Sequence, residues 1–277
     1  MIFTIKAFAK VNLSLDIIGK YPDGYHEIVS VFHSIELFDL LTLRPICKKN
    51  LILDSNIKIE NNILQKIWDY ISSKYDIKSG LYVNLEKNIP LMSGLGGGSS
   101  DASAFLYAIN LIFSLGLSRK DLVNLSINFG SDMAYFLYGG MCLVEGRGER
   151  VTKLKEYLKE KIILVLPKKG ISTSFAYDLY DKNSKTTDYT EGFFEGRKSG
   201  FIKTGNIFED LILPLDPDLK KIKEVLNENC EWNLMSGSGS AFYAKTKKID
   251  TIREKLSGKA RVIVSSFKPL ELELIEF

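Results

Sequence analysis

The stretch PLMSGLGGGSSDAS, from Pro90 to Ser103, decides how this chain is interpreted. A strand-like segment, residues 80–89, precedes it, and a helix-like segment follows from about Ser99. Glycine lets the backbone turn where a Cβ atom would clash, so that several N–H groups can face one anion. Four glycines fall within five residues here: Gly94, Gly96, Gly97 and Gly98. A helix start adds unpaired N–H groups and the positive end of the helix dipole. The stretch therefore predicts a phosphate-binding turn between a strand and a helix.

Two other glycine-rich phosphate motifs do not fit this stretch. It lacks the Gly-Lys-Ser/Thr of a P-loop, and Ser99 stands three residues after Gly96, where the dinucleotide motif GxGxxG requires glycine. A plain glycine-rich turn is the remaining alternative. The two serines, Ser99 and Ser100, and the change from strand to helix favour phosphate binding over it.

Composition indicates a packed globular protein. The chain has 277 residues, 45% of them hydrophobic and 26% charged, which fits one or two domains with a sizeable core. The formal net charge of +3 is small, and charged residues are not clustered in long runs of one sign. Nucleic acid is therefore not an expected partner. We expect a monomer or a weak homodimer.

Cysteine content and hydropathy favour a cytoplasmic protein. The three cysteines, Cys47, Cys142 and Cys230, are widely spaced and odd in number, which predicts free thiols in a reducing compartment. The first residues have the character of a strand and not of a basic and then apolar leader. The longest aliphatic run, residues 162–166, is too short to cross a bilayer, so no membrane partner is expected.

Hydrophobic periodicity predicts a mixture of strands and helices. Alternation over residues 5–15 predicts a half-buried strand, and residues 62–75 and 104–112 each place apolar side chains on one helical face. A lysine-rich polar stretch precedes a new strand at 161–167, which suggests a domain boundary. Residues 181–206 are polar and contain glycine, so we expect a long surface loop or a partly mobile segment there.

A phosphoryl-transfer site needs a base and a cation more than covalent chemistry. Asp132 is the candidate base, although an aspartate near a predicted helix start is also a favoured N-cap. Lys10 is the candidate cation; the alternative is a lysine that projects to solvent. Because side chains alternate along a strand, Lys10, Asn12 and Ser14 share one face, which predicts a polar strip that lines a cleft.

The two histidines, His26 and His33, are too few for a histidine-rich metal site or a histidine pair, so we expect recognition from them and not reaction. Tyr25 and His26 follow the tight turn PDGY, where an aromatic face and an imidazole can stack on and hydrogen-bond a planar base. The alternative for Tyr25 is packing over the sheet edge. His33 is expected to be structural.

Three further polar features remain open in their roles. Ser99 and Asp101 open the helix after the phosphate turn and can either stabilise its start or help to hold Mg²⁺. Residues 235–240 form a second glycine-serine turn, and residues 146–149 (GRGE) are typical of a hairpin turn.

Five stretches, spread in order along the chain, resemble the GHMP kinases, the family of galactokinase, homoserine kinase and mevalonate kinase. They are AKVNLSL (9–15), DGYHEI (23–28), GLGGGSSDA (94–102), GSDMAYFLYGG (130–140) and MSGSGSAF (235–242). Phe8, where proline is usual, and Met133-Ala134, where Val-Pro is usual, depart from the family pattern. These departures concern the local backbone and not the reacting groups.

The resemblance implies an α+β fold of two domains with the active site in the cleft between them. Residues 1–155 would form the N-terminal ATP-binding domain, with helices layered over a sheet. Residues 156–277 would form the C-terminal domain, a ferredoxin-like α/β sandwich.

The resemblance also implies ATP as the phosphoryl donor, with Mg²⁺ held by ligands that remain unassigned. The implied ATP-binding residues are Pro90, Leu91, Met92, Ser93, Gly94, Leu95, Gly96, Gly97, Gly98, Ser99 and Ser100. Asp132 would accept the proton of the attacking hydroxyl, and Lys10 would pair with Asp132 and steady that hydroxyl.

The GLGGGSSDA variant is narrower and resembles the branch of the family that acts in the non-mevalonate isoprenoid route. It implies a small-molecule substrate, a cytidine-diphosphate-linked sugar alcohol, phosphorylated on its 2-hydroxyl. The implied substrate-binding residues are Asn12, Tyr25, His26, Thr173 and Tyr177, with Phe175 as the alternative to Tyr177 for the second aromatic against cytosine. A homoserine or mevalonate kinase, and a non-catalytic nucleotide- or sugar-binding regulator on this fold, remain as alternatives.

Overall fold

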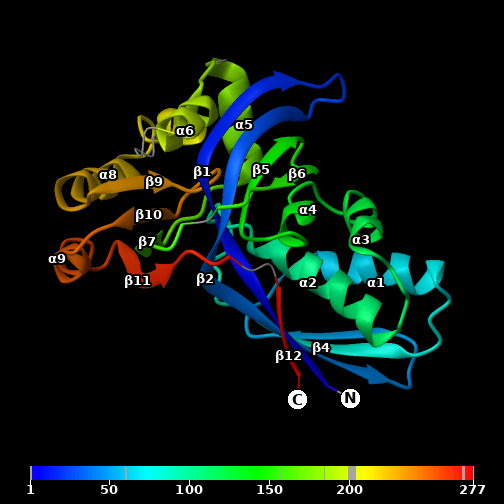
Figure 1. Ribbon diagram of the computed structural model, residues 1–277. Coiled ribbons are helices and arrows are strands. Elements are labelled where there is room, and N and C mark those ends of the chain that lie inside the picture. The colour runs from blue at the N-terminus through cyan, green and yellow to red at the C-terminus, as the bar shows by residue number, and fades with distance from the viewer. Residues whose placement is uncertain are drawn as a thin grey trace.

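The computed structural model describes residues 2–59, 61–156, 158–183, 185–198, 204–269 and 272–276. Two long antiparallel strands, β1 (Phe3–Lys20) and β2 (His26–Ile46), run through the molecule as one hairpin (Figure 1). Strands β12 (Leu272–Glu276), β4 (Gly80–Glu86) and β3 (Leu51–Ser55) extend the sheet in the order β12-β1-β2-β4-β3. Near the hairpin end, β5 (Met141–Gly146) pairs with β2 and with β6 (Arg150–Lys153), and the short β8 (Gly205–Asn206) pairs with β1.

Helices cover one face of this first sheet at the end where the two termini lie (Figure 1). They are α1 (Ile63–Lys74), α2 (Gly97–Ile112), α3 (Arg119–Ser126) and the short α4 (Met133–Phe136). The predicted apolar face of α1 is confirmed by Ile67 and Ile71, which are fully buried. Ser118 and Asp121 form a capping box at the start of α3, because each side chain binds the other residue's backbone N–H.

The second half of the chain builds a four-stranded antiparallel sheet in the order β11-β7-β10-β9. Its strands are β7 (Lys161–Pro167), β9 (Trp232–Met235), β10 (Phe242–Lys245) and β11 (Ala260–Ser266). The helices of this half are α5 (Thr173–Asn183), α6 (Tyr189–Lys198), α7 (Ile207–Ile212), α8 (Pro217–Asn229) and α9 (Ile249–Lys255). The mixture of elements confirms the α+β class. The boundary after residue 155 and the ferredoxin-like description of this half stay predictions.

The long hairpin contributes side chains to each of the four hydrophobic clusters of the described residues. Ile5 and Leu41, near the termini, pack with α1 and α2. Leu15, Ile17 and Ile28, near the hairpin end, pack with residues of α5, α7, α8 and the second sheet. The hairpin therefore holds the two halves of the chain against each other, and β12, which follows β11, returns to pair with β1.

The expectation of a surface loop over residues 181–206 is wrong for most of this range, because the structure has the end of α5, helix α6 and strand β8 there. Residues 184 and 199–203 lie outside the described residues. Asp16, buried in β1, accepts hydrogen bonds from the backbone N–H groups of Tyr189 (2.9 Å) and Thr190 (2.7 Å), and from the hydroxyl of Thr187 (2.5 Å). A carboxylate at a helix start satisfies its free N–H groups. This tertiary contact explains a helix whose own sequence has weak periodicity.

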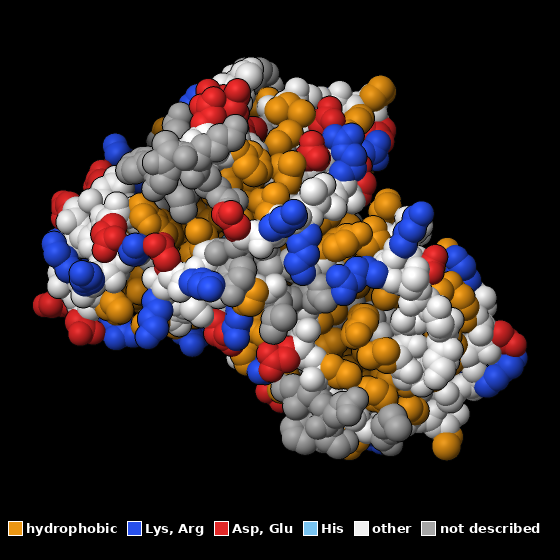
Figure 2. All heavy atoms as spheres, in the orientation of Figure 1, with side chains coloured by type: hydrophobic (Ala, Val, Ile, Leu, Met, Phe, Trp, Pro, Cys, Tyr) orange, Lys and Arg blue, Asp and Glu red, His pale blue; other side chains and the backbone are white. Residues whose placement is uncertain are grey.

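None of the described helices is long and apolar enough to span a membrane. The three cysteines carry thiols and are not joined in disulfide bonds, as predicted. Figure 2 shows lysine and arginine side chains in a band across the middle of one face of the molecule, with acidic side chains scattered around it.

Candidate active site

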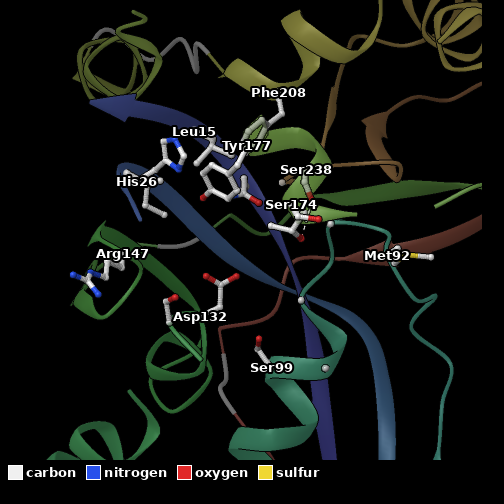
Figure 3. Close-up of a pocket in the computed structure, with 18 of the residues that line it drawn as sticks. Leu15, His26, Met92, Ser99, Asp132, Arg147, Ser174, Tyr177, Phe208 and Ser238 are labelled. Atoms are coloured by element: carbon white, nitrogen blue, oxygen red, sulfur yellow. Dashed lines mark hydrogen bonds between the residues drawn. The ribbon is translucent and has the colours of Figure 1, made fainter. Parts of the chain in front are cut away.

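A cavity of about 1020 Å³ lies where β1 and α5 meet the phosphate turn, the turn between β1 and β2, and the turn between β5 and β6 (Figure 3). Both predicted catalytic residues and all the predicted substrate-binding residues line it: Lys10, Asp132, Asn12, Tyr25, His26, Thr173 and Tyr177. The predicted ATP-binding residues that line it are Pro90, Leu91, Met92, Ser93, Gly94, Gly96, Gly97, Gly98 and Ser99. The structure thus brings together segments that are far apart in the sequence.

The phosphate turn has the backbone that its glycines predict. Gly94 (φ 76°) and Gly96 (φ 74°) lie in the left-handed region, and Gly96 is the N-cap of α2. A Cβ on Gly98 would meet nothing within 4 Å, so the N-terminus of α2 is open to the cavity there. Ser99, in the first turn of α2, lines the cavity and points into it (Figure 3). An anion can therefore approach the start of this helix closely.

Two residues of the predicted ATP set, Leu95 and Ser100, turn away from the cavity. Leu95 is 1% exposed and packs in the core, while its carbonyl oxygen accepts the backbone N–H of Lys10 at 3.0 Å. The hydroxyl of Ser100 donates to the carbonyl oxygen of Phe8 at 2.7 Å, and its N–H bonds within the helix. These residues hold the turn against β1, and their inclusion in the ATP-binding set stays a prediction.

The second glycine-serine turn, residues 235–240, lies directly on the phosphate turn. The hydroxyl of Ser236 donates to the carbonyl oxygen of Gly94 at 3.0 Å, and the N–H of Ala241 donates to the carbonyl oxygen of Ser93 at 3.0 Å. On the other side, the amide of Asn206 donates to the carbonyl oxygens of Met235 and Gly237, each at 2.8 Å. The second half of the chain thus closes one wall of the cavity and supports the phosphate turn.

Lys10 is buried, with 4% of its surface exposed, so the alternative of a solvent-facing lysine is excluded. Its ammonium group donates to Oδ1 of Asn12 at 2.7 Å and lies 4.5 Å from the centre of the Phe32 ring. Burial lowers the pKa of Lys10, and the negative charge of Asp132 acts in the opposite direction. The Lys10 ammonium and the Asp132 carboxylate therefore interact across the cavity that both residues line.

Asp132 is the N-cap residue of α4, but its side chain makes no capping hydrogen bond, so the carboxylate does not stabilise the start of that helix. Its carboxylate points into the cavity between Ser99 and Tyr177 (Figure 3). Burial, with a further contribution from the Asp132 charge, raises the pKa of Tyr177. A carboxylate with no structural partner of this kind is available to accept a proton.

The predicted polar strip on β1 extends only to Asn12. A β-bulge between Asn12 and Ser14 shifts the register against β2, so Leu15 and not Ser14 faces the cavity. Ser14 instead shares a hydrogen bond of 2.9 Å with the hydroxyl of Thr190. The inclusion of Ser14 in the strip is therefore wrong, because strict alternation does not continue through a bulge.

The end of the cavity furthest from the phosphate turn is aromatic. His26 and Tyr177 stack with ring centres 4.7 Å apart and planes 20° apart. Tyr25 is 57% exposed, with the guanidinium of Arg147 4.9 Å from its ring centre. Phe175, the alternative to Tyr177, is 51% exposed and lies outside the cavity lining. This end offers flat faces and an imidazole to a planar group.

Comparison with known proteins agrees with this geometry. The family profile "GHMP kinases N terminal domain" matches residues 62–140. A relative named 4-diphosphocytidyl-2-C-methyl-D-erythritol kinase, from Thermosipho africanus, is 38% identical over 86% of this chain and 89% of its own length. One of the same name, from Listeria monocytogenes, is 35% identical over 93% of this chain and 92% of its own length. This chain belongs to the 4-diphosphocytidyl-2-C-methyl-D-erythritol kinase family. The predicted resemblance is confirmed.

Solved structures extend the family membership to the fold. A crystal structure of 4-(cytidine 5'-diphospho)-2C-methyl-D-erythritol kinase superposes with a TM-score of 0.81 at 27% identity and covers 95% of this chain and 98% of its own. A homoserine kinase from Cytophaga hutchinsonii has a TM-score of 0.73 at 19% identity, covering 99% of this chain and 97% of its own, and shares the fold. The chain is thus a small-molecule kinase with the GHMP fold.

Sequence reasoning missed a buried charge cluster next to the phosphate turn of this kinase. The ammonium of Lys87 binds the carboxylates of Asp39 and, at 2.6 Å, Asp101. Asp39 also accepts the backbone N–H groups of Asn88 (2.5 Å) and Ile89 (2.8 Å), which lead into the turn. Burial raises the pKa of Asp101 well above its usual range, and Lys87 opposes this. One oxygen of Asp101 is therefore held by Lys87, while Asp101 also lines a smaller neighbouring cavity, and its role as a metal ligand stays open.

Two other cavity residues were also missed. The GRGE segment forms the predicted hairpin turn between β5 and β6, but it also carries Arg147 into the cavity, where it pairs with Asp23 at 2.6 Å. Asp181 of α5 binds His26. An arginine between two glycines at a hairpin tip was a usable signal for the first, whereas no local pattern marks the second.

Proposed function

We propose that this chain transfers the γ-phosphoryl group of ATP to the 2-hydroxyl of 4-diphosphocytidyl-2-C-methyl-D-erythritol, giving the 2-phosphate and ADP, in the non-mevalonate route to isoprenoid precursors. The observation that carries the proposal is the order of groups along one cavity. Asp132 lies between Ser99 of the phosphate turn at one end and the His26–Tyr177 aromatic pair at the other (Figure 3), and Lys10 lines the same cavity. The phosphoryl donor, ATP, and an acceptor that carries a nucleoside can therefore meet at Asp132, the proposed catalytic base.

The ATP phosphates would bind at the open N-terminus of α2, where Gly98 leaves space and the free N–H groups face the cavity. A second cavity of about 340 Å³ adjoins the first and shares Lys87, Leu91, Gly98 and Ser99 with it. Its lining includes the apolar Ile59 and Ile63, which suit the adenine nucleoside of ATP. With the nucleoside there, the γ-phosphate would lie toward the larger cavity.

Asp132 would accept the proton of the attacking 2-hydroxyl. The Lys10 ammonium, which lines the same cavity, would hydrogen-bond the hydroxyl oxygen as it attacks. Asn12 fixes that ammonium, because the Asn12 amide nitrogen donates to the Ser30 hydroxyl at 2.9 Å and leaves Oδ1 for Lys10. Thr173, whose hydroxyl lies 3.3 Å from that of Ser238, lines the same cavity and would contact the substrate.

The cytosine would bind at the aromatic end, against Tyr25 and Tyr177 and within hydrogen-bond reach of His26. Base stacking on aromatic rings is favourable by about 1–3 kcal/mol. The guanidinium of Arg147 is at this end as well and provides positive charge for the diphosphate. The substrate would thus lie along the cavity with its sugar alcohol at Asp132.

Mg²⁺ would accompany the ATP phosphates, since Mg²⁺ in kinases is bound by phosphates and one or two protein oxygens. The described residues contain no group of three or more acidic, histidine or cysteine side chains suited to a metal on their own. The Ser99 hydroxyl, which points into the cavity, is the oxygen ligand that fits. When bound, the ion supplies charge neutralisation between the transferred phosphates. We expect this chemistry in the cytoplasm, where cysteine thiols remain reduced.

The test is ADP release from the purified protein with Mg-ATP and a panel of four acceptors. The panel holds 4-diphosphocytidyl-2-C-methyl-D-erythritol, methylerythritol phosphate, mevalonate and homoserine. Release with the first compound alone is the expected result. Release with mevalonate or homoserine would replace the substrate assignment but keep the fold and the base. ATP binding without transfer to any acceptor would favour a regulatory binding protein instead.

A further inference from the structure

His26 is surrounded by one face of helix α5. Its ring stacks on Tyr177 and lies edge-on to Tyr180, with ring centres 5.7 Å apart and planes 88° apart. Its Nε2 atom lies 2.7 Å from Oδ1 of Asp181. These three partners are at positions i, i+3 and i+4 of the helix, which share one face. A residue of the first hairpin is thus oriented by the second half of the chain.

Asp181 is itself fixed as a charged acceptor. Its other oxygen, Oδ2, accepts from the ammonium of Lys20 at 2.6 Å. The hydrogen bonds from Lys20 and from His26 hold the pKa of Asp181 below its usual range. A carboxylate accepts and does not donate, so Nε2 of His26 must carry the proton of this contact. In the neutral imidazole, Nδ1 is then an acceptor.

We propose that Asp181 is a positioning residue that makes His26 a hydrogen-bond acceptor toward the base and thereby selects cytosine over uracil. The inference rests on the proposed function, because it concerns the base of that substrate. Cytosine carries a 4-amino group, which donates to Nδ1. Uracil carries a 4-oxo group, whose lone pair faces that of Nδ1 with no proton between them. An unsatisfied buried polar pair costs about 1–3 kcal/mol, so the expected discrimination is roughly 10–100-fold.

The remaining histidine provides an internal reference for the protonated nitrogen. His33 is fully buried; its Nδ1 lies 2.9 Å from the carbonyl oxygen of Ser34, and its Nε2 accepts the N–H of Leu158 at 3.1 Å. His33 is therefore protonated on Nδ1, opposite to His26. Since the chain has two histidines, the two tautomers can be read from one nitrogen spectrum.

The first measurement is a long-range ¹H–¹⁵N correlation spectrum of the imidazoles in the wild type and in Asp181→Asn. We expect one Nε2–H and one Nδ1–H ring in the wild type, with the Nε2–H ring lost or mixed in the variant, because an asparagine amide can either donate or accept. An Nδ1–H tautomer for both histidines in the wild type would overturn the proposal.

The second measurement compares kcat/KM for the cytidine-diphosphate substrate and its uridine-diphosphate analogue at saturating ATP. Asp181→Asn should reduce the cytidine preference at least about tenfold while KM for ATP stays unchanged, and Asp181→Glu should retain part of the preference. Lys182→Gln, an exposed neighbour on the same helix, is the matched control and should keep the wild-type ratio. An unchanged ratio in Asp181→Asn overturns this inference alone, whereas no phosphorylation of either compound by the wild type overturns the proposed function.

Discussion

Substitution of Gly94 by alanine should separate the two glycine turns that form the floor of the cavity. A Cβ on Gly94 would lie 2.0 Å from the carbonyl oxygen of Ser236 and 2.9 Å from the backbone nitrogen of Gly239. Both neighbours are backbone atoms, so a rotamer change cannot relieve the contact. Gly94 also has a φ of 76°, which alanine adopts unfavourably.

The expected loss of stability follows from these contacts. The left-handed backbone costs alanine about 1 kcal/mol. Moving the turns apart removes two hydrogen bonds, from the Ser236 hydroxyl to Gly94 and from the Ala241 N–H to Ser93, each worth about 1 kcal/mol. The sum is about 3 kcal/mol. For a chain of this size each kcal/mol lowers Tm by roughly 2–4 °C, so the expected decrease in Tm is roughly 6–12 °C.

The assay is thermal unfolding of the ligand-free protein, followed by circular dichroism. Gly98→Ala is the matched control, because it changes the same turn at a position where a Cβ meets nothing within 4 Å and φ is not positive. Alanine is also the better helix former in the first turn of α2. A Tm for Gly94→Ala equal to that of the wild type, or an equal decrease in Gly98→Ala, would refute the reasoning.

Three further substitutions test other parts of the structure. Asp132→Asn should lower kcat by roughly 10²–10⁴ with Tm unchanged, because the carboxylate is the proposed base and makes no cap bond; near-normal turnover would remove it from the mechanism. Asp16→Ala should reduce the free energy of unfolding by about 2–4 kcal/mol, since it leaves two backbone N–H groups of α6 and a hydroxyl without their acceptor; a proteolysis rate of α6 equal to wild type would contradict this. His33 has its pKa lowered to about 4 by burial, so the unfolded chain binds the proton first as pH falls below 6.5. The free energy of unfolding should therefore decrease by about 3 kcal/mol between pH 6.5 and pH 4 and then level off, and His33→Gln should reduce that slope in denaturant titrations.

The parts of the site that depend on local backbone geometry could be predicted from the sequence. The left-handed glycines, the open N-terminus of α2 and the capping box of α3 each depend on residues within a few positions of one another. Their physical causes, a missing Cβ and the unpaired N–H groups of a helix start, can be recognised in the sequence. The order of the five motifs along the chain then identified the correct family.

Contacts between distant segments could not be predicted in this way. Helix α6 forms where a loop was expected, because its first N–H groups find Asp16, which lies more than 170 positions earlier in the chain. Lys87 binds both Asp39 and Asp101 inside the protein, whereas the sequence showed only an acidic residue at a helix start. Burying a charged side chain without a partner costs free energy, so the position of a buried charge depends on partners that can be far away in the sequence.

The β-bulge after Asn12 changes which side chains of β1 face the cavity. Before it, Lys10 and Asn12 face the cavity beside the phosphate turn; after it, Leu15 does, and Ser14 turns to α6. Strict alternation would have placed a hydroxyl beneath the aromatic end and Leu15 on the opposite face, away from the apolar residues that it contacts in the second half of the chain. One strand can therefore present polar groups where phosphoryl transfer is proposed and an apolar side chain near the stacked rings. The extra residue thus separates the reacting end of the cavity from the end that recognises the base.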